Sequence, residues 1–314
     1  MYGSSIIKNN LEIFDMITFS KLGTKGNLGN QLFQIASTIG LAEKYGHKYG
    51  FPNWSYSKYF RNQIPFLHND HSFEIVREKE FNYYEWNLEN GNYDIVGWLQ
   101  SEKYFNIEKT KEIFQFEDFK NDVYLKYNFL FSKKTILVSV RRGDFVKNPH
   151  FYQLSHSYYL KAIIENFPDW KERNIIFTSD DIAYCKYHFS FLKNSHFLDS
   201  LSAIEQLAFG TKCDDYVISN STFSWWIAWL GEKENSKVIR PIKNLRGDFA
   251  KINNDVDYFP KRWISFDDKN YNLRNEYWWF RIKGFVYEFL VGSQIKFRKR
   301  KNKIKKKIKK YILK

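Results

Sequence analysis

The chain has 314 residues, of which 43% are hydrophobic and 20% aromatic, so it is long and apolar enough for two domains with buried cores. Its net charge of +14 is concentrated at the C-terminus: twelve Lys and Arg residues lie between Lys296 and Lys314, and elsewhere 37 basic residues face 35 acidic ones. A nearly neutral body argues against nucleic acid as the partner. The absence of a signal-peptide pattern and of eighteen consecutive apolar residues predicts neither secretion nor a membrane-spanning helix.

The first predicted unit combines a strand, a glycine-rich turn and a helix. Residues 1–15 carry little pattern and are interpreted as an extension, after which Met16–Leu22 reads as a strand. The helix is predicted over Asn30–Tyr45, closed by Gly46. This arrangement brings backbone N–H groups close to an anion or a sugar hydroxyl. Gly29, Asn30 and Gln31 supply more amides at the helix start than a cap needs, which favours a binding role.

Residues 48–134 contain short predicted elements and the expected domain boundary. Residues 48–92 are aromatic and polar and predict insertions and short elements. A strand is expected to start at Tyr93 and end near Gly97–Leu99. Gln100 would then face a cleft at the end of this strand. The alternative is that Gln100 belongs to an ordinary polar helix start. We expect a helix and crossover over Ile107–Tyr127 and place the domain boundary within residues 128–134.

The second half alternates strands and helices, which predicts a doubly wound parallel sheet. The expected strands are Ile136–Val140, Asn174–Thr178, His196–Leu198, Asp215–Ser219 and Lys237–Arg240, and the expected helices are Tyr158–Phe167, Ile182–Phe189, Ser202–Gly210 and Asn220–Leu230. The predicted division is therefore an extension at 1–15, an α/β domain at 16–130, a second, Rossmann-like domain at 131–270 and a helical, polybasic segment at 271–314.

Three of these strands end in polar clusters. The clusters are Arg141, Arg142 and Asp144; Ser179, Asp180 and Asp181; and Asn220, Ser221, Thr222 and Ser224. The carboxyl ends of parallel strands share one edge of a sheet, where ligands bind. Arginine side chains and a helix start that carries hydroxyl groups suit a diphosphate. For the arginine cluster the alternative is a surface turn with a local ion pair. For the cluster at Asn220 the alternative is an ordinary N-cap. Trp225, Trp226 and Trp229 are expected in the core.

Five motifs in order resemble the α-1,2-fucosyltransferases of glycosyltransferase family 11. They are Gly26–Ala36, Gly97–Phe105, Val140–Phe145, Phe177–Asp181 and Ser219–Trp226, and the resemblance spans Met16–Trp263. It implies a GT-B-like fold with two Rossmann-like domains facing a cleft, GDP-fucose as donor, a galactosyl-type acceptor, inversion at the anomeric carbon, and no metal or other cofactor.

The resemblance also implies roles for single residues. Donor binding falls to Ser139, Arg141, Arg142, Asp180, Asp181, Ser221, Thr222 and Ser224; the acceptor side to Gly29, Asn30, Gln31 and Gln100; and catalysis to Arg142, Asp144 and Asn30. The arginines would neutralise the donor phosphates, and Asp180 or Asp181 would read guanine. Ser139 stands where the family usually has histidine, which leaves another nucleotide-sugar donor as an alternative.

Catalysis without a metal fits a donor whose leaving group is a diphosphate that arginines can stabilise. Asp255-Val-Asp257 lies after the last predicted strand and is interpreted as a loop. Asp144 is the candidate general base, with positioning of Arg142 as its alternative role. On this basis Arg142→Ala is expected to abolish transfer in a folded protein.

The C-terminal segment is predicted to contain two kinds of helix. Tyr277–Leu290 is expected to pack on the body, and from Gln294 a basic amphipathic helix follows, with Ile304, Ile308, Tyr311 and Ile312 on one face. Such a helix is predicted to bind an anionic membrane surface through Lys296–Lys314. One alternative is that the segment is a solvated tail. Another is that the whole chain is a polyanion-binding protein with a degenerate nucleotide-binding fold.

These observations together favour a cytoplasmic enzyme at the inner face of the membrane that acts on a glycan or a lipid-linked oligosaccharide. Cys185 and Cys213 lie among apolar neighbours without metal-type spacing and predict buried thiols in a reducing compartment.

Overall fold

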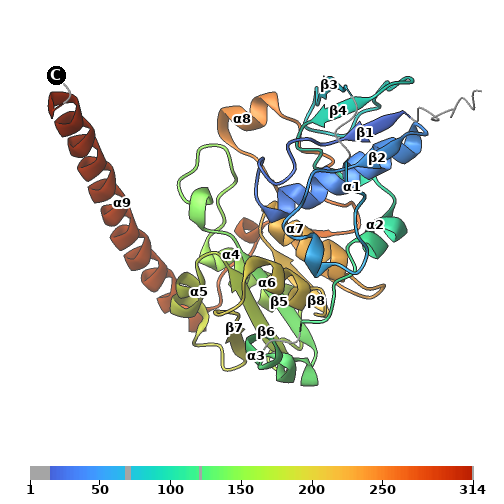
Figure 1. The fold of residues 1–314 in the computed structure, drawn as a ribbon. Helices are drawn as coiled ribbons and strands as arrows, with labels where there is room; N and C mark the ends of the chain where they lie inside the picture. Colours follow the sequence, from blue (N-terminus) through green and yellow to red (C-terminus); the bar gives the residue numbers. More distant parts are fainter. Residues whose placement is uncertain (1–14, 68–71, 120–121, 313–314) are drawn as a thin grey trace, which may run out of the picture.

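The computed structural model describes residues 15–67, 72–119 and 122–312, which form two α/β units and a long C-terminal helix (Figure 1). The first unit has a four-stranded parallel sheet in the order β2-β1-β4-β3. Its strands are β1 (Met16–Thr18), β2 (Lys48–Gly50), β3 (Glu74–Arg77) and β4 (Tyr93–Val96). Its helices are α1 (Leu28–Lys44) and α2 (Ile107–Ile113), and the short α3 (Asp122–Leu125) precedes the second unit.

The second unit has a six-stranded sheet in the order β10-β9-β8-β5-β6-β7, with every described pair parallel. Its strands are β5 (Thr135–Val140), β6 (Asn174–Ser179), β7 (Ser195–Phe197), β8 (Asp215–Ile218), β9 (Val238–Pro241) and β10 (Ile264–Phe266). Its helices are α4 (His156–Asn166), α5 (Ile182–Phe189), α6 (Ala203–Gly210), α7 (Thr222–Gly231) and α8 (Gly247–Ile252). Two parallel α/β units confirm the predicted GT-B-like fold.

The register brings the polar clusters of the second half together. Val140 of β5 is the partner of Ser179 of β6, and Ser139 of β5 is the partner of Ile218 of β8. The strand ends that lead into Arg141, Asp180 and Asn220 therefore lie at one edge of the sheet. All six residues of β5 are buried, as its apolar sequence predicts.

The two units share a hydrophobic core where α1 packs on α7. The ring of Phe33 on α1 lies 4.5 Å from Trp225 and 4.9 Å from Trp226 on α7. Trp225, Trp226 and Trp229 are fully buried, so their predicted place in the core is confirmed. A charged contact reinforces the junction, because Glu102 accepts a hydrogen bond from Trp229 Nε1 and pairs with Arg262.

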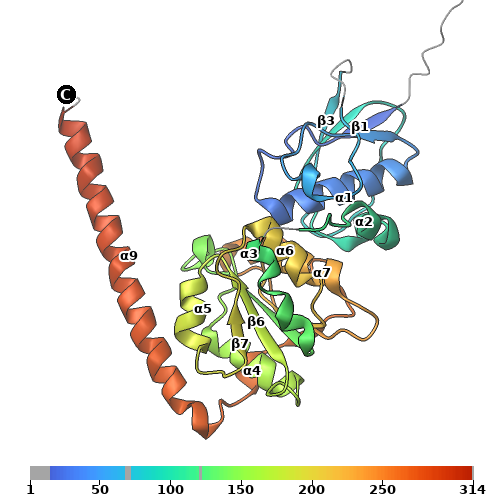
Figure 2. The same ribbon diagram turned by 60° about the horizontal axis from the view of Figure 1, so that its bottom comes forward.

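The C-terminal helix α9 (Trp278–Ile312) extends well beyond the body, as Figures 1 and 2 show. Its first turns dock through the fully buried Phe280 and through Gly284, which lies against His156. Other apolar side chains of the same turns stay in solvent: Phe285 is 74% exposed and Phe289 is 67% exposed. The prediction that Tyr277–Leu290 packs on the body is therefore correct for one face and wrong for the other.

Two further expectations concern the membrane and the thiols. In the part of the chain that the structure describes, no helix has both the length and the apolar character needed to cross a bilayer. Cys185 and Cys213 are free and fully buried, as predicted, and burial raises the pKa of each thiol to about 12.

Candidate active site

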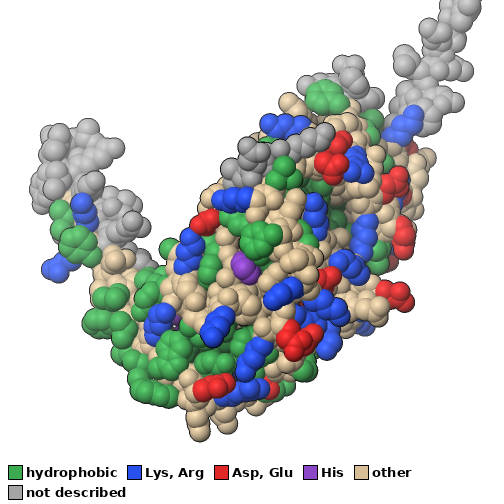
Figure 3. All heavy atoms as spheres, turned by 90° about the horizontal axis from the view of Figure 1, so that it is seen from below, with side chains coloured by type: hydrophobic (Ala, Val, Ile, Leu, Met, Phe, Trp, Pro, Cys, Tyr) green, Lys and Arg blue, Asp and Glu red, His purple; other side chains and the backbone are tan. Residues whose placement is uncertain are grey.

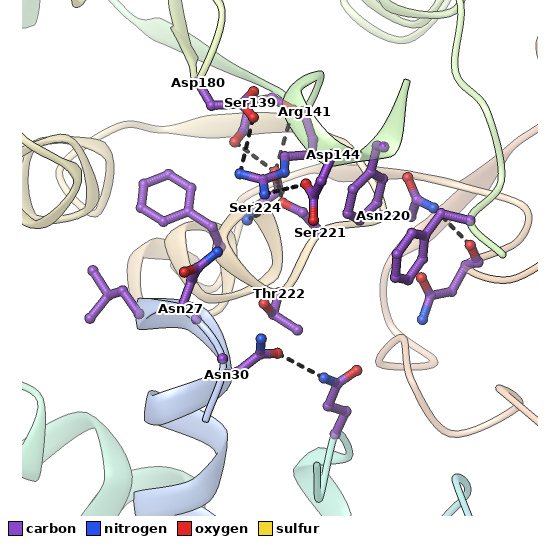
Figure 4. A pocket seen from close by; sticks show the side chains of 18 of the residues that line it. Asn27, Asn30, Ser139, Arg141, Asp144, Asp180, Asn220, Ser221, Thr222 and Ser224 are labelled. Atoms are coloured by element: carbon purple, nitrogen blue, oxygen red, sulfur yellow. Dashed lines mark hydrogen bonds and ion pairs between the residues drawn. The ribbon is translucent and has the colours of Figure 1, made fainter. Parts of the chain in front are cut away.

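A cavity of about 630 Å³ lies where the first turn of α1 faces the strand ends of the second unit (Figure 4). Its volume is in the range of small-molecule sites. The first unit lines it with Gly26, Asn27, Gly29, Asn30, Gln31, Trp98 and Gln100, and the second with Ser139, Arg141, Asp144, Asp180, Asn220, Ser221, Thr222 and Ser224, among others. The structure thus brings most of the predicted site residues to one place.

Arg141 supplies the positive charge of this cavity. Its guanidinium donates to Asp144 Oδ1 at 2.5 Å and lies 3.1 Å from Asp180 Oδ2. Both carboxylates hold the guanidinium at the cavity wall, and a guanidinium fork is a group that binds phosphate. Gly143 makes this geometry possible, because a Cβ atom there would lie 2.3 Å from Asp180 Oδ2.

Arg142 and Asp181 lie outside this cavity, unlike their neighbours in sequence. The Arg142 side chain is buried, its guanidinium carbon is 4.1 Å from the centre of the Tyr184 ring, and Nη2 is 3.2 Å from Glu288 Oε1. Asp181 is the N-cap of α5 and accepts a hydrogen bond from the Tyr184 amide at 3.0 Å. The donor-binding roles expected of both residues stay predictions, without support from their position.

Four buried serine hydroxyls form a cluster at the start of α7. Ser224 Oγ lies 2.7 Å from Ser139 Oγ, 2.7 Å from Ser219 Oγ and 2.9 Å from Ser221 Oγ. One hydroxyl has a single donor and two acceptor positions, so these three neighbours occupy all of Ser224. The cluster fixes where α7 begins, and Thr222 lines the cavity at that helix start. Ser219 was not among the predicted site residues, and it joins the cluster because its amide donates to the Ser139 carbonyl across the sheet.

The residues predicted for the acceptor side divide into two groups. Asn30 Oδ1 accepts from Gln100 Nε2 at 2.9 Å, so two amides from different segments meet on the cavity wall. Gln31 is a support for the glycine-rich turn, since Nε2 donates to the Gly26 carbonyl and Oε1 accepts from Trp54 Nε1. Gly29 lies against α7, where a Cβ atom would be 2.5 Å from the backbone of Thr222 and Phe223.

Aromatic side chains and loop anchors complete the wall, and of these only Asn220 belongs to a predicted polar cluster. Phe145 and Phe151 stack with ring centres 4.2 Å apart and planes 5° apart. Asn220 Nδ2 donates to the carbonyls of Asn244 and Tyr152 and so ties two loops to the end of β8. Phe151, Tyr152 and Asn244 lie in segments without periodic patterns, which explains why their positions could not be predicted.

Comparison with known proteins identifies the family of the chain. The family model for glycosyl transferase family 11 matches residues 13–267. An Escherichia coli α-1,2-colitosyltransferase is 27% identical over 187 residues, covering 56% of this chain and 63% of the relative. The E. coli O-antigen biosynthesis glycosyltransferase WbnK is 36% identical over 124 residues, covering 36% and 40%. The Bos taurus galactoside 2-α-L-fucosyltransferase SEC1 is 27% identical over 237 residues, covering 67% and 63%.

The matched segments thus span less than two thirds of these relatives' own lengths. Among solved structures, fucosyltransferase NodZ from Bradyrhizobium aligns over 68% of this chain and 91% of its own, with a TM-score of 0.48 and 12% identity. Since the family model covers most of the sequence and both α/β units, the resemblance of the five motifs is confirmed: the chain belongs to glycosyl transferase family 11.

Proposed function

We propose that this protein transfers L-fucose from GDP-fucose to a galactosyl-type hydroxyl of a glycan or lipid-linked oligosaccharide, forming an α-1,2 linkage with inversion. The observation that carries the proposal is the single cavity in which Arg141 and the start of α7 face the amides of Asn30 and Gln100. One side suits a diphosphate and the other suits sugar hydroxyls.

The reaction needs charge stabilisation more than covalent chemistry. The acceptor oxygen bonds to the anomeric carbon while the bond from that carbon to the diphosphate oxygen breaks, and the electron pair leaves with GDP. Arg141 and the N–H groups at the start of α7 would stabilise this developing charge. The proton of the acceptor hydroxyl goes to a general base, for which Asp144 is the candidate on the cavity wall.

The proposal includes no metal ion. Arg141 and the helix N-termini supply positive charge where a metal would otherwise act. The two carboxylates of Asp255-Val-Asp257 have other contacts, since Asp255 accepts from the amides of Asn244 and Leu245, and Asp257 pairs with Lys103.

The experiment that tests the donor is a thermal-shift and transfer panel with GDP, GDP-fucose, GDP-mannose and UDP-galactose, in EDTA. We expect GDP and GDP-fucose to raise Tm, because binding to the folded state alone stabilises it. We also expect fucose transfer to lactose. A larger shift with UDP-galactose, or transfer that stops in EDTA, would contradict the proposal.

A second donor deserves the same test because one relative is named a colitosyltransferase and because Ser139 replaces the usual histidine. Nucleotide-linked colitose therefore belongs in the panel. Faster transfer of colitose than of fucose would support the proposed reaction type and identify the colitose nucleotide as the donor.

We further propose that α9 holds the protein at the inner face of an anionic membrane. Trp278, Ile282, Phe285, Phe289, Phe297 and Ile304 are exposed at helical spacing along it, a set we call the α9 stripe. Figure 3 shows hydrophobic side chains gathered along the edge of the molecule from which the C-terminal segment projects. Twelve basic residues lie between Lys296 and Lys314, and each contributes about 1 kcal/mol of binding free energy near an anionic surface.

Removing residues 296–314 is expected to abolish binding to phosphatidylserine vesicles in a flotation assay, and binding of the full chain is expected to weaken as salt rises. The double variant Phe285→Ser/Phe289→Ser, which keeps every charge, is expected to weaken binding as well. Vesicle binding that survives the truncation would contradict the membrane proposal. Salt-sensitive heparin binding with no affinity for vesicles would favour a soluble polyanion instead.

A further inference from the structure

One side chain of the C-terminal helix contacts Arg142, the neighbour of Arg141 in the chain. Glu288 is the only acidic residue after Glu276, and its carboxylate faces Arg142. On the basis of the function proposed above, we infer that Glu288 is a positioning residue for the donor-binding turn and acts through Arg142. The family match ends at residue 267, so this contact belongs to a part of the chain outside the family model.

The environment of Arg142 requires a partner of opposite charge. The side chain is only 9% exposed, and its guanidinium packs on the buried ring of Tyr184. A buried charge without a counter-ion is strongly destabilising. Among the described residues, Glu288 is the carboxylate that the structure places within ion-pair distance of this guanidinium, at 3.2 Å.

The backbone of Arg142 connects this pair to the cavity. Its amide donates to Asp180 Oδ1 at 2.8 Å, and the other oxygen of Asp180 lies 3.1 Å from Arg141 Nη1. Its carbonyl accepts from the amides of Phe145 and Val146, which close the turn that carries Asp144. A shift of Arg142 therefore moves both carboxylates that orient Arg141.

Two glycines let α9 approach this region closely. A Cβ atom at Gly284 would lie 1.9 Å from His156 Cε1, and one at Gly292 would lie 3.1 Å from Lys147 Nζ. Lys147 follows the Asp144 turn directly, so α9 lies against α4 on one side of Glu288 and against the end of that turn on the other. Burial lowers the pKa of His156 to about 4, which leaves a neutral ring under the helix at pH 7.

Removing the charge of Glu288 distinguishes two possible roles of Arg142, direct contact with the donor and support of the turn. If Arg142 contacted donor phosphates directly, Glu288→Gln would free its charge and leave GDP affinity unchanged or increase it. If Arg142 instead holds the turn, the same substitution loosens Asp180 and Arg141, and GDP affinity falls.

The test is GDP titration calorimetry on the full chain with matched variants. We expect Glu288→Gln to weaken GDP binding 5- to 30-fold, Glu288→Asp to restore part of the affinity, and Glu276→Gln to match the unsubstituted protein. The double variant Arg142→Ala/Glu288→Gln is expected to bind GDP no more weakly than Arg142→Ala alone, because the two substitutions break the same contact. Unchanged or tighter GDP binding by Glu288→Gln, or additive losses in the double variant, would overturn the inference.

A second readout needs no ligand. Hydrogen exchange of the amides from Arg142 to Val146 is expected to accelerate in Glu288→Gln and not in Glu276→Gln. Exchange that matches in all three proteins would also overturn the inference. If the unsubstituted protein fails to bind GDP, the proposed function is wrong, and the exchange result still decides whether Glu288 holds the turn.

Discussion

Arg141→Ala is expected to lower the transfer rate by roughly 10²–10³-fold, the loss typical of removing one preorganised donor from a developing anion. The guanidinium lines the cavity and is already oriented by Asp144 and Asp180 before any donor arrives. Its side chain is partly exposed, so the protein should remain folded. Initial rates with GDP-fucose and lactose, together with GDP affinity, measure the effect.

Two variants make the Arg141 result specific. Arg141→Lys keeps the charge and loses the planar fork, so it should recover only part of the activity. Arg61→Ala removes an arginine from a surface pair with Asp118 and should leave the rate within a factor of two. Near-normal transfer by Arg141→Ala would remove the diphosphate site from this cavity.

Gly29→Ala is expected to damage both stability and activity. The new Cβ atom would lie 2.5 Å from the backbone carbon of Thr222 and from the backbone nitrogen of Phe223, and backbone atoms cannot rotate away. Separating α1 from α7 should cost about 1–3 kcal/mol of unfolding free energy, as overpacking does. The loss of transfer should be larger, about 10²-fold, since a shift of 1 Å between donor and acceptor sides misaligns the reacting atoms.

Chemical unfolding and initial rates on the same preparation test the Gly29 prediction. Gly50→Ala serves as the matched control, because its Cβ atom would lie 3.3 Å from Leu67 Cα, and it should cost less than about 1 kcal/mol. Wild-type rates in Gly29→Ala would mean that the contact between α1 and α7 does not set the cavity geometry.

The second α/β unit could be predicted from sequence because buried parallel strands appear as apolar runs with polar ends. The run Ile136–Val140 corresponds to β5, and the structure places Arg141, Asp180 and Ser221 around one cavity as expected. The first unit was less predictable, since β2 and β3 are short and lie among aromatic residues without a clear period.

The orientation of single side chains could not be predicted. Consecutive residues at a strand end point to opposite sides, so Arg141 enters the cavity while Arg142 turns toward Tyr184. The partner that stabilises Arg142, Glu288, is 146 residues away, and no local pattern links them. Asp180 and Asp181 diverge in a similar way, because Asp181 starts α5.

The two apolar faces of α9 explain why its packing was predicted only in part. Trp278–Leu290 is mostly apolar, with Arg281, Lys283 and Glu288 as its charged residues, and a mostly apolar helix is typically buried. The body covers only the side that contains Phe280 and Gly284 and leaves the α9 stripe in solvent.

Because α9 is a single unbroken helix, its sides keep a fixed angular relation along its whole length. The side seated on His156 and the side carrying the α9 stripe cannot turn independently of one another. A surface that receives the stripe therefore also sets the roll and tilt of the globular body above it. The mouth of the cavity would then point in one defined direction, so that only acceptors at a particular height and angle could enter.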